Sequence, residues 1–358
     1  MILETLHLKN FRNYETLDLE LNPQLNLFVG PNAQGKTNAL EAIYFLATTR
    51  SHRTHHDREL MRWESSEMRV SAIVKKNHTT LPLDVTMTAK GRVASVNHLK
   101  ETRLADYIGQ LNVILFAPED LELIKGSPAG RRRFLDMEIG QVDSLYLYDV
   151  LRYNRVLKER NSYVRLERAQ IDPIFLDVLD AQLLEYGTKV INGREKFVAK
   201  LQQYAAEIHA QLTHSLEELK ITYQPKTTAD RFQEQLTERR NLDLMRHQTS
   251  IGPHRDELTF HVNGINVADF GSQGQQRTVA LSVKLAEIEL MHAETGEYPI
   301  LLLDDVMSEL DNTRQLDLLD AALDKTQTFI TTTTLDHLQN LPDKLQIFNV
   351  INGHIKNA

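Results

Sequence analysis

The hydrophobic pattern at the two ends of the chain predicts alternating strands and helices. Leucines alternate with polar residues over 17–21, as in a strand with one buried face. The apolar run 25–29 leads through a glycine-containing loop into a helical pattern that begins at residue 36. Later in the chain we expect strands at 258–262, 299–303, 327–331 and 345–350, and helices at 273–293 and 313–323. The two ends are therefore predicted to build one α/β lobe.

The middle of the chain has a different pattern. Residues 69–99 resemble several short strands, which predicts a β-rich subdomain. From 129 to 218 glycine is scarce and leucine recurs at helical spacing, which indicates an inserted helical arm with two long antiparallel helices. Pro173 is expected to mark a break between helices. We therefore expect lobe segments at 1–128 and 251–358, with the arm at 129–250.

Composition excludes several classes of protein. The chain has 358 residues, of which 41% are hydrophobic and 25% charged, as in ordinary soluble proteins. No apolar run is long enough for a membrane span, and the N-terminus lacks a signal-peptide pattern, so we expect a cytoplasmic protein. The absence of cysteine excludes disulfides and thiol catalysis. The net charge of −8 means that any DNA-binding face must be a local patch.

The run from Gly30 to Thr37 has the pattern of a phosphate-binding loop. Its backbone N–H groups would surround phosphates at the start of the following helix. Lys36, expected at an open position, would neutralise the β- and γ-phosphates of ATP, and the Thr37 hydroxyl would ligate Mg²⁺. A purely structural turn is the alternative, which the flanking strand and helix disfavour. The predicted nucleotide-binding residues are Gly30, Pro31, Asn32, Ala33, Gln34, Gly35, Lys36 and Thr37.

Two acids follow the apolar strand expected at 299–303. Open α/β sheets bind ligands at the carboxyl ends of their strands, where Asp304 and Asp305 would lie. We expect Asp304 to hold Mg²⁺ and Asp305 to orient or deprotonate the attacking water. The alternative is a core strand followed by a helix cap, which the adjacent Ser308–Asp311 disfavours. Together with Lys36, these two acids are the candidate catalytic residues.

A third element, Ser272-Gln273-Gly274, lies between the phosphate loop and the acid-tipped strand. Serine and glycine at a helix N-terminus can accept an anion. This order of elements predicts an ATPase whose nucleotide is covered by a second copy of the chain. A plain helix cap, in which Ser272 and Gln275 bond to each other, explains the same residues.

Basic residues gather in two regions that could contact DNA. One is Arg50, Arg53, Arg58 and Arg62. The other is the segment 131–168, which contains nine basic and six acidic residues. In that region Arg152, Arg155 and Lys158 recur every third residue, as a stripe on a helix or simply as a solvated face. The Arg131–Arg133 run could equally attach the arm to the lobe.

Two further patterns favour structural roles. His52, His55 and His56 suggest a metal site only weakly, since no carboxylate or cysteine accompanies them at a ligand spacing. Gly252–Asp256 lies where the arm returns to the lobe, and we interpret it as a hinge and packing element, with contact to nucleotide as the alternative.

Three segments carry a resemblance to the RecF family of bacterial recombination-mediator ATPases, relatives of SMC proteins and ABC-type ATPases. They are Leu8–Tyr14, Pro118–Asp136 and Asp304–Asp311, and the match extends over the whole chain. The resemblance implies an ABC/SMC-type P-loop ATPase lobe with Arg12 near the nucleotide. It also implies an ATP-dependent homodimer with slow hydrolysis, binding to single-stranded and gapped DNA, and work with RecR and RecO. Recombinase loading, replication restart and the SOS response would follow.

Two departures from transporter ATPases predict weak turnover. Thr331–Thr334 stands where those proteins carry a switch histidine, and no metal-sensing glutamine is found near Phe116–Glu119. Competing functions are less consistent with the sequence. A transporter ATPase subunit would have its helical segment elsewhere, and a chromosome-organising protein needs a far longer coiled coil. A P-loop kinase would leave the element at 272–277 without a role.

Overall fold

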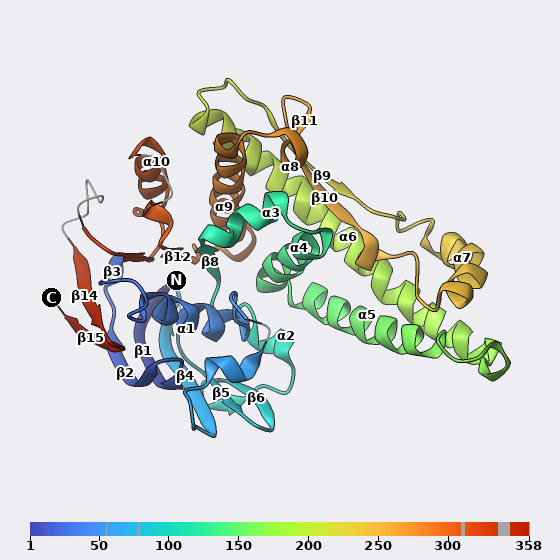
Figure 1. Cartoon of the computed structure of the whole chain (residues 1–358), viewed down its shortest axis with the longest axis horizontal. Coiled ribbons are helices and arrows are strands. Elements are labelled where there is room, and N and C mark those ends of the chain that lie inside the picture. The colour runs from blue at the N-terminus through green and yellow to red at the C-terminus, as the bar shows by residue number, and fades with distance from the viewer. Residues whose placement is uncertain (55, 78, 309–311, 336–343, 358) are drawn as a thin grey trace. The chain divides into compact units, whose positions relative to one another are not determined.

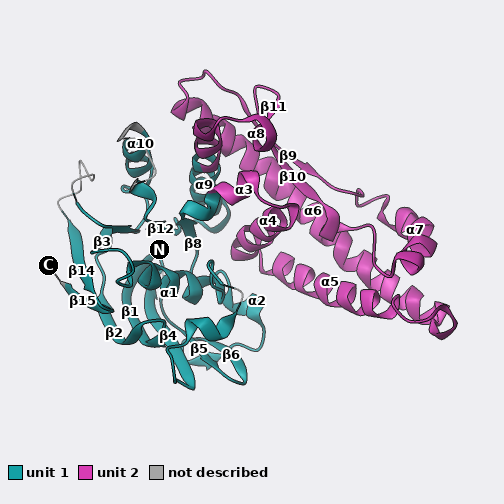
Figure 2. Ribbon diagram, in the orientation of Figure 1, with its two compact units in different colours: residues 1–120, 281–358 teal, residues 121–280 magenta. Residues whose placement is uncertain are grey.

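The computed structural model describes all residues except 55, 78, 309–311, 336–343 and 358. Its contacts divide the chain into two compact units (Figure 2). Unit 1 comprises residues 1–120 and 281–358, and unit 2 comprises residues 121–280. No helix in the described part of the chain is both long and apolar enough to cross a bilayer.

A six-stranded, mostly parallel sheet forms the centre of unit 1 (Figure 1). Its strand order is β15-β14-β3-β13-β12-β8, and only the β14–β15 pair is antiparallel. Leu27, Leu302 and Ile330 are completely buried in it. The strands are β3 (Leu25–Val29), β8 (Val113–Phe116), β12 (Ile300–Asp304), β13 (Thr328–Thr332), β14 (Leu345–Ile351) and β15 (His354–Asn357). Because β3 pairs with β13 and β14, the α/β lobe expected from both chain ends is confirmed.

A second, antiparallel sheet of unit 1 is the expected β-rich subdomain. Its order is β2-β1-β4-β5-β6-β7. The strands are β1 (Ile2–Phe11), β2 (Tyr14–Glu20), β4 (Glu67–Lys75), β5 (Thr80–Thr88), β6 (Gly91–Val96) and β7 (Leu99–Lys100). The helices of this unit are α1 (Lys36–Thr48), η1 (Asp57–Leu60), α2 (Leu104–Tyr107), η2 (Pro118–Asp120), η5 (Val306–Ser308) and α10 (Asn312–Ala322). Helix α1 packs against strands of both sheets and so joins them.

Unit 2 is the helical arm together with a small sheet. Its long helices α5 (Ser144–Tyr163) and α6 (Pro173–Leu212) lie side by side (Figure 1). Pro173 occupies the first turn of α6, where a missing N–H costs nothing. The other helices are α3 (Leu121–Lys125), α4 (Pro128–Val142), η3 (Arg168–Gln170), α7 (Phe232–Arg246), η4 (Pro253–Arg255) and α8 (Val267–Phe270). Helix α9 (Gln273–Thr295) begins in unit 2 and ends in unit 1.

The compact units divide the chain at 120/121 and 280/281 rather than at the expected 128/129 and 250/251. The alternating strand and helix pattern after residue 250 predicted that the strand at 258–262 belongs to the ATPase lobe. Instead β10 (Glu257–Val262) pairs with β9 (Leu219–Gln224) and β11 (Ile265–Asn266) in a separate three-stranded sheet. The pairing partner of β10 therefore lies in the arm, and residues 251–280 group with it.

The Gly252–Asp256 segment has the packing role that its sequence predicted. Arg194, which is almost fully buried, donates to the Pro253 carbonyl at 2.7 Å. The Tyr153 hydroxyl lies 2.6 Å from His254 Nδ1, and burial lowers the pKa of His254 to about 4. These contacts bind the segment to α5 and α6.

Candidate functional site

The loop after β3 has a backbone that only particular residues allow. Ala33 and Gly35 have φ angles of 63° and 119°, in the left-handed region. A Cβ atom on Gly35 would lie 2.7 Å from Asn13 Nδ2 and 3.0 Å from the Tyr14 hydroxyl. A side chain therefore does not fit there. Because α1 begins at Lys36, the loop lies at the N-terminus of a helix, which favours bound anions.

The turn between β1 and β2 braces this loop. Asn13 Nδ2 donates to the Gln34 carbonyl at 3.2 Å, and the Tyr14 hydroxyl donates to the Gly35 carbonyl at 2.9 Å. From the other side, the Asn352 N–H donates to Gln34 Oε1 at 2.7 Å. The loop is thus held by segments from both ends of the chain.

Lys36 is not at the open position that the sequence suggested. It is only 6% exposed, and Nζ donates to the carbonyls of Gly30 at 2.6 Å and Pro31 at 2.9 Å. Burial lowers the pKa of Lys36, whereas Asp305 and Asp304 oppose this shift. The loop curls around its own lysine, whose ammonium group supplies these two carbonyls with a donor.

Two oxygens suited to a magnesium ion lie side by side. The Thr37 hydroxyl donates to Asp304 Oδ1 at 2.8 Å, although the two residues are far apart in sequence. Mg²⁺ prefers oxygen ligands from one or two protein groups, together with water and phosphate. The residues fit the ion that the sequence predicted at this point.

Thr331 is a site residue that the sequence analysis missed. It is completely buried at the end of β13, and its hydroxyl donates to Asp304 Oδ1 at 2.8 Å. The Thr331 hydroxyl oxygen also accepts a bond from the Asp305 N–H at 2.8 Å, and Asp305 has a φ of 54° that turns the chain out of β12. One threonine therefore positions both acids. The parallel register of β12 and β13 could have identified it, because it pairs Asp304 with Thr331.

Arg12 pairs with the buried carboxylate of Glu41 beside the loop. Arg12 Nε and Nη2 donate to the Glu41 carboxylate at 2.8 and 2.6 Å, and Ser51 donates to it at 2.5 Å. Burial raises the pKa of Glu41, but the bonds from Arg12 and Ser51 outweigh it and leave that pKa lowered. Glu41, on α1, thus holds the Arg12 side chain that the family resemblance places near the nucleotide.

His52 lies near this cluster. Burial lowers its pKa, against the opposing effects of Glu41, Asp304 and Glu119. Its ring meets that of Tyr44 edge-on at 5.3 Å. Across the described residues there is no group of three or more histidines and acids that could hold a metal, and His55 lies outside them.

Ser272, in unit 2, caps α9. The Gln275 N–H donates to Ser272 Oγ at 3.2 Å, and the Ser272 N–H donates to Gln275 Oε1 at 3.0 Å. These are the reciprocal bonds of a capping box. They use a lone pair of the Ser272 oxygen and leave its O–H able to donate. Gln273 and Gly274 form the exposed first turn of the helix.

The basic residues fall into two kinds. Arg131 is buried and pairs with Glu257 at 2.7 Å, and Arg132 donates to the Asp256 carbonyl, so these two pin α4 to β10 within unit 2. Arg152, Arg155 and Lys158 are exposed along α5. Arg152 lies over the Tyr148 ring, and Arg155 pairs with Glu159 at 3.6 Å. This stripe presents charge to solvent.

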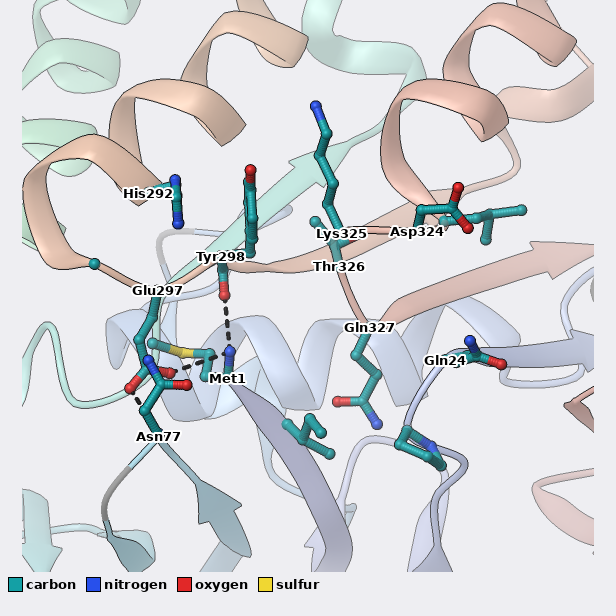
Figure 3. Close-up of a pocket in the computed structure, with 14 residues that line it drawn as sticks. Met1, Gln24, Asn77, His292, Glu297, Tyr298, Asp324, Lys325, Thr326 and Gln327 are labelled. Carbon is teal, nitrogen blue, oxygen red and sulfur yellow. Dashed lines mark hydrogen bonds and ion pairs between the residues drawn. The ribbon is translucent and has the colours of Figure 1, made fainter.

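A hollow of about 360 Å³ opens at the end of the parallel sheet where strands β3 and β13 begin (Figure 3). Gln24 and Gln327 line it where β3 and β13 begin. The His292 and Tyr298 rings, which also line it, stack at 3.9 Å. At the opposite end of the sheet, the phosphate loop follows β3, and the two acids lie at the carboxyl end of β12. The hollow is therefore separate from the nucleotide site.

Comparison with known proteins agrees with this geometry. The family model described as RecF/RecN/SMC N terminal domain matches residues 2–356. The DNA replication and repair protein RecF of Lactococcus lactis subsp. cremoris is 64% identical over 356 residues, which are 99% of both chains. The protein of that name from Streptococcus pneumoniae is 52% identical, covering 99% of this chain and 98% of its own.

Solved structures give the same result. One described as the recombination mediator protein RecF with ATP in the RecFOR pathway matches with a TM-score of 0.91 and 33% identity. It covers 100% of this chain and 97% of its own. An Smc head domain from Pyrococcus furiosus matches with a TM-score of 0.57 and 17% identity, which shows a shared fold. The resemblance found in the sequence is confirmed, and the chain belongs to the RecF family of ABC-type ATPases.

Proposed function

We propose that this protein is an ATP-dependent DNA-binding protein of recombinational repair, replication restart and SOS induction. In this proposal it is a weak ATPase that dimerises with ATP and binds DNA at single-strand gaps. The observation that carries the proposal is the 2.8 Å bond between Thr37 and Asp304 beside a braced phosphate loop. The full-length relatives named as DNA replication and repair proteins support the cellular role.

The loop and its neighbours would bind the nucleotide. Backbone N–H groups from Gly30 to Gly35 surround the phosphates, and Lys36 exchanges its two carbonyl acceptors for phosphate oxygens. Thr37 and Asp304 hold Mg²⁺, which neutralises charge on the phosphates. Asp305 orients or deprotonates the water. Arg12, at the edge of the same site, completes the set of cations.

The second half of the site would come from a partner copy. Ser272, Gln273 and Gly274 present a helix N-terminus and a hydroxyl donor, and these stabilise a partner's γ-phosphate. The capping box and the anion contact are compatible, because the cap uses a lone pair of the Ser272 oxygen and the Ser272 O–H can donate a hydrogen bond to the phosphate. ATP thereby links two protomers.

Partners and compartment follow from the family. The RecFOR pathway, in the description of the similar RecF structures, supports work with RecR and RecO in recombinase loading. The ATP-dependent dimer would present its basic residues to single-stranded and gapped DNA. A DNA-repair role supports a cytoplasmic location.

The dimer is tested at Ser272. Ser272→Arg is expected to leave ATP binding by the monomer intact and to abolish ATP-dependent dimers, because the bulky cation fills the space for the partner's phosphate. Light scattering and fluorescence anisotropy with labelled gapped DNA, each with and without ATP and Mg²⁺, measure the dimer and the DNA affinity together.

Ser272→Thr is the matched control, since it keeps both the cap and the hydroxyl. Mixing Ser272→Arg with Lys36→Ala leaves at most one competent site per heterodimer. Normal ATP-dependent dimers of Ser272→Arg would show that this element is a helix cap alone. A wild-type protein whose DNA affinity ignores ATP would contradict the proposed switch.

The stripe on α5 makes a separate prediction. Reversing the charges of Arg152, Arg155 and Lys158 is expected to weaken binding to all DNA sequences alike. The salt dependence should flatten by about one unit for each lost phosphate contact. Titrations at several salt concentrations measure this slope. An unchanged affinity and slope would make the stripe a solvated helix face.

A further inference from the structure

Trp63, the only tryptophan of the chain, is also the most exposed large hydrophobic side chain among the residues that the structure describes. Its exposed fraction is 93%, whereas tryptophan is normally well buried in folded proteins. Within the described residues the indole has no aromatic or cationic neighbour in contact. Exposure of so large an apolar surface is unfavourable in the isolated protein and is typical of a binding position.

The backbone around Trp63 is firmly held. Trp63 is the second residue of a turn closed by a bond from the Ser65 N–H to the Arg62 carbonyl, at 3.2 Å. Glu64 has a φ of 66°, as the third residue of a type II turn requires. The Arg62 N–H donates to the Asn10 carbonyl at 2.9 Å, which attaches the turn to the end of β1. The indole is thus presented on a rigid support.

The same segment offers cations for a phosphate backbone. Arg50 and Arg58 are exposed, and their guanidinium groups make no hydrogen bond or ion pair within the described part of the chain. Of the segment's acids, Asp57 pairs with Arg92 at 3.3 Å and Glu59 accepts from Thr54, whereas Glu64 is exposed next to Trp63. Free guanidinium groups and an exposed indole match a ligand with both phosphates and flat rings.

We propose that Trp63 stacks on an unpaired base of single-stranded DNA, with Arg50 and Arg58 contacting the flanking phosphates. Aromatic side chains in basic surfaces bind single strands in this way. Bases inside a duplex already stack on each other, so only an unpaired base can reach the indole. This inference rests on the proposed DNA-binding function and assigns its single-strand contact to unit 1.

The support of Trp63 also touches the nucleotide site. Arg12, two residues beyond Asn10, donates its N–H to the Leu60 carbonyl and its Nη1 to the Glu59 carbonyl at 2.7 and 2.8 Å. Phe11 pairs with Met61. The β1 end that holds this turn therefore continues into the turn that braces the phosphate loop. A nucleotide that recruits Arg12 can alter DNA contact at Trp63.

Intrinsic fluorescence tests the proposal directly, because all tryptophan emission comes from Trp63. In the presence of ATP and Mg²⁺, an oligo-dT strand and a gapped duplex are expected to quench the emission, and a blunt duplex to leave it unchanged. Anisotropy with labelled DNA should show that Trp63→Ala loses about 5- to 150-fold in single-strand affinity. Trp63→Phe keeps a ring and should lose less.

Leu99→Ala is the matched control, since Leu99 is 72% exposed in the β-rich sheet of the same unit. It should bind DNA like the wild type, and ATP binding should survive in every variant. If DNA binds while the emission stays constant and Trp63→Ala binds normally, the assignment of Trp63 is wrong and the DNA-binding function stands. Equal quenching by a blunt duplex would overturn the single-strand contact. Absence of all DNA binding, with or without ATP, would reject the proposed function and this inference together.

Discussion

Lys36→Ala is expected to lower the affinity for ATP by about 100-fold or more while leaving a folded protein. The ammonium group is the only side-chain cation that the loop itself supplies, and charge-assisted bonds to phosphate are worth about 1.5–3 kcal/mol each. In the substituted protein the β- and γ-phosphates would meet only backbone dipoles. Isothermal titration with ATP and Mg²⁺ measures the loss.

The structure adds a cost in stability that an open loop would not have. Lys36 donates to two loop carbonyls, so its removal should lower the free energy of unfolding by about 1 kcal/mol. Lys76→Ala is the matched control, because Lys76 is also partly buried and donates to a carbonyl, that of Gly109. It should bind ATP normally. Wild-type ATP affinity in folded Lys36→Ala would remove the loop's assigned role.

The strands of the ATPase lobe were predictable, but the partner of β10 was not. An apolar core strand such as β12 is recognisable because both of its faces are buried, which gives a continuous apolar run. Strand β10 alternates buried and half-buried residues, a pattern that suits any sheet with one covered face. The pairing of β10 with β9 is set by the tertiary fold. Residue spacing alone therefore assigned β10 to the ATPase lobe rather than to the separate three-stranded sheet.

The site shows the same division between local and tertiary information. The phosphate loop and Asp304 follow from residue types that one local pattern requires. From the sequence, Thr331 indicated only that the switch histidine of transporter ATPases is missing. Its role depends on its register opposite Asp304, which residue types do not reveal. The burial of Lys36 depends on how the loop's carbonyls turn inward. At Ser272 a helix cap and an anion site require the same residues, so only the dimer experiment separates them.

Replacing Asp305 is expected to separate ATP binding from ATP hydrolysis. Asp305→Asn should still bind ATP, since Asp304 and Thr37 are unchanged, but turnover should fall about 100-fold or more when the general base is lost. Asparagine suits this test because it tolerates the φ of 54° at this position and keeps the N–H that donates to Thr331. ATP-bound dimers should then accumulate. Single-turnover hydrolysis, followed together with light scattering, measures both effects.

Asp304→Asn is the contrasting variant. It weakens a ligand of Mg²⁺, so it should reduce Mg²⁺-dependent ATP binding as well as turnover, whereas Asp305→Asn should affect turnover alone. If Asp305→Asn hydrolyses ATP at the wild-type rate, the base lies elsewhere. Glu309, which is outside the described residues, is then the next acid to replace. Because Thr331 contacts both acids, Thr331→Val should in either case impair turnover. The Asp304 carboxylate would lose the hydroxyl donor that positions it, and the Asp305 N–H would lose its acceptor.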